Sequence, residues 1–117
     1  MSDRENIVLS KSYRFAIRIV KMYQHLSSEK KEYILSKQVL RSGTSIGANA
    51  EEAVGGISKA DFKAKMSIAY KEARETEYWL RLLHDTGYIE KEAFVSIIAD
   101  LKELLKILFS IIKTAGK

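Results

Sequence analysis

The sequence predicts an all-α fold, an antiparallel four-helix bundle with up-down-up-down order. Three observations support this prediction. The 117 residues include no proline, which would interrupt helix interiors. Apolar residues recur at helical spacing in four successive segments. Short breaks rich in serine or glycine separate these segments, at Ser27–Ser28, Gly55–Gly56 and Thr86–Gly87. A chain of this length forms a single domain, residues 1–117.

The first predicted helix, about residues 6–26, has a wide apolar arc. The arc approaches half of the helix circumference, which exceeds the stripe of about 100° that one core face needs. The excess predicts a second buried surface, such as a contact between subunits. The residues of the arc are Phe15, Ala16, Ile19, Val20, Tyr23 and Leu26.

A basic stripe lies on the other side of the same helix, with spacings of three, four and three residues. It consists of Lys11, Arg14, Arg18 and Lys21. The net charge of the chain is +5, and residues 1–26 hold the largest share of the excess. The stripe predicts contacts with the phosphates of RNA or DNA. The alternative is an ordinary solvated outer face.

The second predicted helix, about residues 29–54, contains the glycines Gly43 and Gly47. Each glycine costs a helix interior about 1 kcal/mol relative to alanine, which predicts close packing of another backbone at this place. The helix is expected to end at Gly55–Gly56, with a glycine in the left-handed conformation. The residues expected on its buried face are Leu35, Val39, Ile46, Ala50 and Ala53.

The third predicted helix begins with Ser58 and Asp61 at the spacing of a capping box, and Thr86–Gly87 closes it. Its core seam alternates steps of four and three, as bundles require. The small residues in the middle of the seam are expected to face those of the second helix. The seam consists of Phe62, Met66, Ala69, Ala73, Thr76, Leu80 and Leu83. A fourth helix, about residues 90–114, has a broad apolar face and lysines opposite to it.

Polar residues beside the second and third seams predict a structural network that fixes how the helices or subunits meet. Its candidate members are Gln38, Arg41, Asn49 and Glu72, and the expected partner of Glu72 is Arg41 or Lys65. For the stripe on the second helix, the alternative is a half-exposed face without such a role.

No catalytic, cofactor-binding or metal-binding residue is predicted, so the protein is expected not to be an enzyme. There is no cysteine, and neither histidine follows a glutamate at the Glu-x-x-His spacing of di-iron bundles. A metal-dependent enzyme that uses Glu72, Glu75 and His84 is the least favoured alternative. No apolar run reaches the roughly 18 residues of a membrane span, and no signal-peptide core begins the chain. We therefore expect a cytoplasmic protein without a membrane partner.

Several runs of the sequence together resemble one known family. They are Ser12–Ala16 (SYRFA), Gln38–Ser42 (QVLRS), Thr44–Ala53 (TSIGANAEEA), Asp61–Phe62 and Ala69–Leu80 (AYKEARETEYWL). These runs are similar to the four-helix bundle proteins encoded by intervening sequences in bacterial 23S rRNA genes. Relatives of that family are accessory proteins of diversity-generating retroelements.

The resemblance implies a homo-oligomer, typically a ring of five subunits. For the retroelement relatives it also implies basic surfaces that engage nucleic acid and a reverse transcriptase. It brings no catalytic residues. The first hypothesis is therefore a non-enzymatic, oligomeric nucleic-acid-binding or accessory protein. The second is a purely structural or protein-binding scaffold for which nucleic acid is irrelevant.

Overall fold

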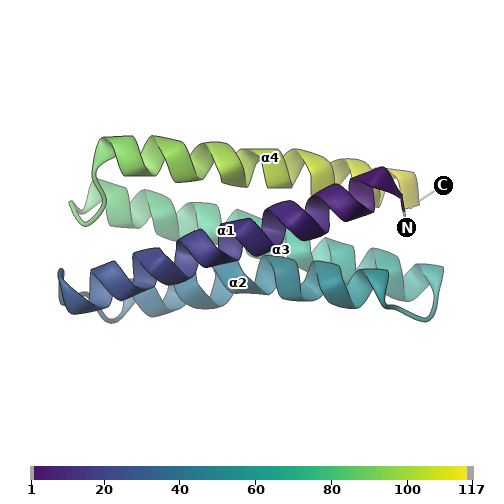
Figure 1. Ribbon diagram of the computed structural model, residues 1–117, viewed down its shortest axis with the longest axis horizontal. Helices are drawn as coiled ribbons and strands as arrows, with labels where there is room; N and C mark the ends of the chain where they lie inside the picture. Colours follow the sequence, from purple (N-terminus) through teal and green to yellow (C-terminus); the bar gives the residue numbers. More distant parts are fainter. Residues whose placement is uncertain (1, 116–117) are drawn as a thin grey trace.

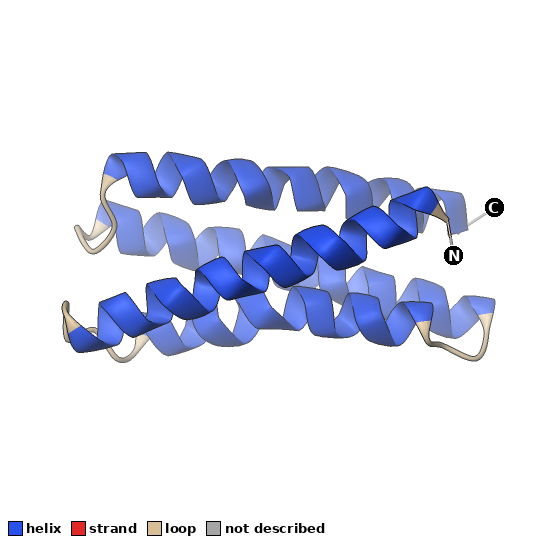
Figure 2. Ribbon diagram, viewed as in Figure 1, coloured by secondary structure: helices blue, strands red, loops and turns tan. Residues whose placement is uncertain are grey.

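All four predicted helices are present in the computed structural model, which describes residues 2–115. They are α1 (Asp3–Ser28), α2 (Leu35–Val54), α3 (Lys59–Asp85) and α4 (Lys91–Ala115). Figure 1 shows them side by side along the longest dimension of a bundle that measures 44 × 21 × 19 Å. Residues 2–115 contain helices, turns and loops but no strand (Figure 2), which confirms the predicted all-α class.

The helices form a ring around one core. Each helix packs against the next one in the chain, and α1 also packs against α4. The start of α1 and the end of α4 lie at the same end of the bundle (Figure 1), which is consistent with up-down-up-down order. The core consists of aliphatic residues from every helix and one phenylalanine. Its largest fully buried members include Phe15, Ile19, Leu26, Ile46, Met66, Leu80, Leu83, Ile97, Leu101, Leu104 and Leu108.

The first helix is longer than predicted at both ends. It begins at Asp3 because Ser2 and Glu5 form a reciprocal capping box, a signal that the prediction of a start near residue 6 missed. It continues through Ser27 and Ser28, which were expected to form the break. The hydroxyls of both serines donate to carbonyl oxygens four residues earlier, which lets them stay within the helix.

The break between α1 and α2 lies at residues 29–34, so the prediction that α2 begins near residue 29 was wrong. Lys31 adopts a left-handed conformation with φ of 55°, which a helix cannot include. The buried carboxylate of Glu32 then accepts the backbone N–H of Ser36 at 2.7 Å and that of Ile34 at 3.3 Å. These bonds satisfy donors that the start of α2 leaves without helical partners.

The glycines at the other breaks behave differently from one another. Gly55 ends α2 with φ of −83°, so the predicted left-handed glycine is not found there. Gly56 is needed for space instead, because a Cβ atom would lie 3.0 Å from the backbone carbonyl oxygen of Ala53 and would also displace the Asp61 carboxylate. Gly87 does adopt the left-handed conformation after α3, with φ of 88°. Ser58 accepts the N–H of Asp61 at 3.0 Å, so it caps α3 as predicted, but among the described helices the return bond of a full capping box is found only at Ser2 and Glu5.

Gly43 and Gly47 allow the close approach of a neighbouring helix, and that helix is α1. A Cβ atom at Gly43 would lie 2.8 Å from Ile19 Cγ1, and one at Gly47 would lie 3.3 Å from Ser12 Oγ. Small residues of α2 and α3 also meet, as expected. The α2 residue at this contact is Ser42, next to Gly43, and it contacts Thr76. Glycines and small polar residues thus serve two different helix contacts.

Candidate functional site

The basic stripe of α1 lies along the boundary with α4, where two of its four members already pair with carboxylates. Lys11 Nζ lies 3.0 Å from Glu103 Oε2, and Arg18 Nη1 lies 2.5 Å from Asp100 Oδ2. Arg18 also donates to the hydroxyl of Ser96 at 3.0 Å. These two cations therefore hold α1 against α4, and a phosphate would have to compete with a carboxylate for them.

The other two members of the stripe are exposed. Arg14 donates to Ser10 Oγ at 2.8 Å, one turn earlier on the same helix. Lys21 forms no ion pair with any carboxylate among residues 2–115. Phosphate contacts by the stripe stay a prediction, with Arg14 and Lys21 as its accessible members.

A second basic surface lies across α3 and α4, and the sequence analysis recognised only its lysines on α4. We call it the cationic face, and it consists of Lys63, Arg74, Arg81, Lys102, Lys106 and Lys113. All six side chains are exposed, and none forms an ion pair within the described part of the chain. One carboxylate, Glu77, lies in the same rows. The cationic face therefore combines high positive charge with groups that are open to a ligand.

Helix geometry places these six cations on one face. On α3, steps of seven, four and seven residues keep one set of side chains in a single row. The row consists of Lys63, Tyr70, Arg74 and Arg81. Lys102, Lys106, Phe109 and Lys113 form a matching row on α4 at steps of four, three and four. The two rows lie next to each other, as the distance of 6.2 Å between the ring centroids of Tyr70 and Phe109 shows.

No single segment of the sequence predicts the cationic face, because each helix contributes only half of it. The face depends on how α3 and α4 align, and two aromatic contacts report this alignment. Tyr70 meets Phe109, and His84 stacks on Phe94 with ring centroids 4.4 Å apart. The sequence signal that could have indicated this face is an aromatic residue in each basic row, Tyr70 in α3 and Phe109 in α4.

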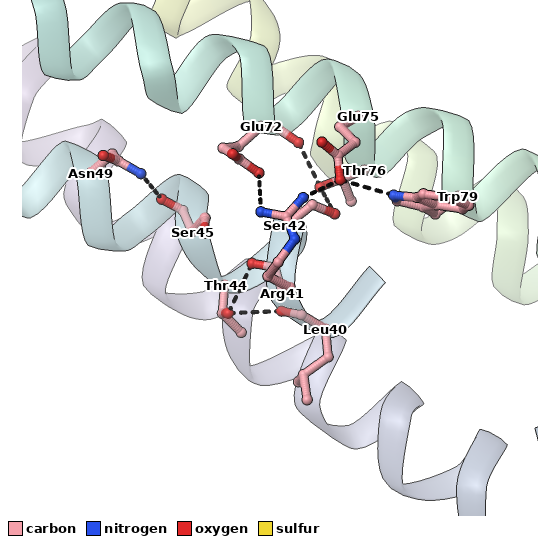
Figure 3. A network of polar contacts seen from close by, with 10 residues as sticks. All are labelled: Leu40, Arg41, Ser42, Thr44, Ser45, Asn49, Glu72, Glu75, Thr76 and Trp79. Atoms are coloured by element: carbon pink, nitrogen blue, oxygen red, sulfur yellow. Dashed lines mark hydrogen bonds and ion pairs between the residues drawn. The ribbon is translucent and has the colours of Figure 1, made fainter. Parts of the chain in front are cut away.

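The predicted polar network is present in part, between α2 and α3 (Figure 3). Arg41 donates to Glu72 at 3.1 Å and also to Glu75. The indole of Trp79 donates to Glu75 at 3.0 Å. This bond lowers the pKa of the Glu75 carboxyl, against the opposing effect of burial and with further help from Arg41. Glu75 and Trp79 were not among the predicted members.

A buried hydroxyl pair extends the contact between α2 and α3. Thr76 Oγ1 lies 2.9 Å from Ser42 Oγ and 2.7 Å from the carbonyl oxygen of Glu72. The threonine has one hydroxyl proton, so if it donates to the carbonyl, Ser42 donates to Thr76. Two predicted members stay outside the network: Asn49 donates to the Ser45 carbonyl of its own helix, and Gln38 is exposed.

Apolar side chains on α1 remain exposed on the side away from the core. We call this surface the α1 apolar band, and it consists of Tyr13, Ile17 and Val20, with exposed fractions of 65%, 41% and 37%. A shallow groove of about 390 Å³ runs along it. Val20 had been assigned to the same arc as the core residues Phe15 and Ile19, whereas the structure turns it outward. The wide arc of α1 therefore covers two separate surfaces.

Comparison with known proteins agrees with this fold. Residues 4–110 match the family described as 23S rRNA-intervening sequence protein. The chain belongs to this family. It is also 55% identical to a protein of unknown function from the S23 ribosomal protein family of Bacteroides thetaiotaomicron, whose crystal structure superposes with a TM-score of 0.93. That similarity covers 94% of this chain and 98% of the other. No curated protein matches the sequence significantly.

In this member of the 23S rRNA-intervening sequence protein family, the residues of the metal-enzyme alternative do not form a cluster. Glu72 and Glu75 bind Arg41, while His84 lies beside Asp85 and stacks on Phe94. His84 follows Glu75 by nine positions along α3, a rise of about 13.5 Å. Among residues 2–115, no group of three histidine, aspartate or glutamate side chains is placed to hold a metal ion.

None of the helices described in residues 2–115 combines the length and the apolar character that crossing a bilayer requires.

Proposed function

We propose that this protein is a non-enzymatic homo-oligomer that binds nucleic acid through a basic surface and acts as an accessory protein. The observation that carries the proposal is the cationic face, where six exposed lysines and arginines adjoin across α3 and α4. Arginine and lysine side chains are the principal donors to phosphate oxygens in nucleic-acid complexes. A surface of this charge attracts a polyanion and releases its counterions on contact.

The cationic face suits this role better than the predicted stripe on α1. A phosphate that binds Lys11 or Arg18 must replace Glu103 or Asp100, and the displaced carboxylate then repels it. Lys102 and Lys106 have no such partner among the described side chains. We therefore assign the main phosphate contacts to the cationic face, with Arg14 and Lys21 as a smaller second contribution.

Assembly into a homo-oligomer is supported by the α1 apolar band. Tyr13, Ile17 and Val20 place apolar area in water that a second copy of the chain would cover. The resemblance to ring-forming relatives suggests five copies, so light scattering should give about five times the protomer mass of 13.3 kDa. A protomer mass at micromolar concentration would contradict assembly but would leave nucleic-acid binding open.

The binding proposal is tested with structured RNA at two salt concentrations. Wild type should bind more tightly than a neutral control protein, with affinity that falls steeply as salt rises. Lys102→Gln with Lys106→Gln should reduce the slope of log K against log salt by about 2. Arg14→Gln with Lys21→Gln removes the same charge from α1 and should change the slope less. No binding by wild type would overturn the proposal.

The second candidate function is a scaffold that binds only proteins, and the α1 apolar band is the observation that favours it. A reverse transcriptase is the partner that the retroelement relatives suggest. A pull-down with and without nuclease separates the two candidates. Partners that all stay bound after nuclease treatment favour the scaffold, whereas partners that are lost favour an accessory role through nucleic acid.

A further inference from the structure

We propose that the cationic face binds single-stranded nucleic acid more tightly than double-stranded nucleic acid, with Phe109 as the side chain on which an unpaired base stacks. This inference rests on the proposed function and concerns the same surface. It starts from the unusual placement of Phe109, an apolar ring that is 56% exposed in the middle of a row of lysines.

The surroundings of Phe109 fit a base between phosphates. Lys106 and Lys113 lie one turn away on either side of it along α4, at rises of about 4.5 and 6 Å. Tyr70 supports the ring from α3, with the ring planes inclined at 46°, and Arg74 follows Tyr70 by one turn. Proteins that hold single strands combine these two parts, a basic track for the backbone and aromatic rings for the bases.

Other occupants fit Phe109 less well. A symmetric contact with a second copy would bring the cations around it against the same cations of that copy. A duplex presents its phosphates outward and keeps its bases stacked, so it gains nothing from an exposed phenyl ring. An unpaired base offers a planar face to the ring while its own phosphates reach Lys106 and Lys113.

The experiment compares three probes on the full chain, a single-stranded oligo(U) of about 16 nucleotides, an RNA duplex of the same length, and heparin. Phe109→Leu should weaken oligo(U) binding at least fivefold while leaving duplex and heparin binding unchanged. Phe109→Trp, which keeps an aromatic ring at this position, should bind oligo(U) as tightly as wild type. Val95→Ala is the matched control, because Val95 is equally exposed on the same helix, and it should change nothing.

The salt dependence supplies a second readout. Phe109→Leu should leave the slope of log K against log salt unchanged, since no phosphate contact is lost, whereas Lys106→Gln should reduce it by about 1. Equal losses for all three probes, no loss for any, or a reduced oligomer mass of Phe109→Leu would each overturn the stacking role. Wild type that binds none of the probes would overturn the proposed function instead.

Discussion

Ile19 of α1 lies directly against the backbone of α2 at Gly43, so closely that a Cβ atom there would come within 2.8 Å of its Cγ1. Ile19 is fully buried, and the close packing of protein interiors leaves a buried side chain few voids into which it can move. We expect Gly43→Leu to lower the free energy of unfolding by about 3 kcal/mol through overpacking. This loss of free energy is measured by denaturant unfolding, with circular dichroism as the signal.

Ala64→Leu is the matched control, since it adds the same kind of side chain to an exposed position in the second turn of α3. It should leave the unfolding midpoint nearly unchanged. If Gly43→Leu were as stable as this control, α1 and α2 could separate without cost, and the close approach at Gly43 would not determine the packing.

The buried hydroxyls of Ser42 and Thr76 give a second prediction. Thr76→Val preserves the shape of the side chain but leaves the Ser42 hydroxyl without its partner, which should cost about 1–3 kcal/mol. Adding Ser42→Ala removes the orphaned hydroxyl. We therefore expect the double variant to be more stable than the sum of the single effects predicts. Strict additivity in a double-mutant cycle would show that the two groups do not interact.

Much of the fold was predictable because it follows from local patterns. The core rows of α3 and α4 follow the helical period, and Ser58 and Gly87 mark the ends of α3 as expected. The junction between α1 and α2 was not predictable in this way. It depends on the left-handed backbone of Lys31 and on a buried carboxylate at Glu32, and neither residue type favours these states.

The candidate surfaces were less predictable than the fold, since they depend on two helices at once. From the sequence alone, Lys11 and Arg18 belong to a basic stripe without partners. In the structure they pair with Glu103 and Asp100 of α4. The arc of α1 could be recognised as too wide for one core face. Its division into a core side and an outer side, with Val20 on the latter, required the positions of α2 and α4.

The carboxylate of Glu32 predicts a pH dependence of stability. Burial raises the pKa of Glu32, but the backbone N–H groups of Ser36, Leu35 and Ile34 outweigh it and hold the pKa below its ordinary value of 4.5. A lowered pKa in the folded state stabilises the fold above the ordinary value, and this contribution is lost as the pH falls through the lower one. Glu32→Gln should therefore cost about 1 kcal/mol at neutral pH.

Urea unfolding at neutral pH and at about pH 3 tests this prediction, because the difference between wild type and Glu32→Gln should shrink in acid. Glu29→Gln removes an exposed carboxylate from the same loop and serves as the control. A difference that is constant with pH would show that the ionised form of Glu32 is not what caps α2.

Ile17 lies in the middle of the α1 apolar band, between Tyr13 and Val20, and it is the position at which assembly is best tested. Ile17→Glu places a charge that a subunit contact would have to bury without a partner, which costs more than the contact gains. Because 41% of Ile17 is already in water, the protomer itself should tolerate the change. We expect the mass in light scattering to fall toward 13.3 kDa while the helix content stays constant. Ile68→Glu alters a side chain of similar exposure, 38%, on α3 and should keep the wild-type mass. If Ile17→Glu kept that mass too, the band would face solvent in the assembly, and the subunits would have to meet through another surface.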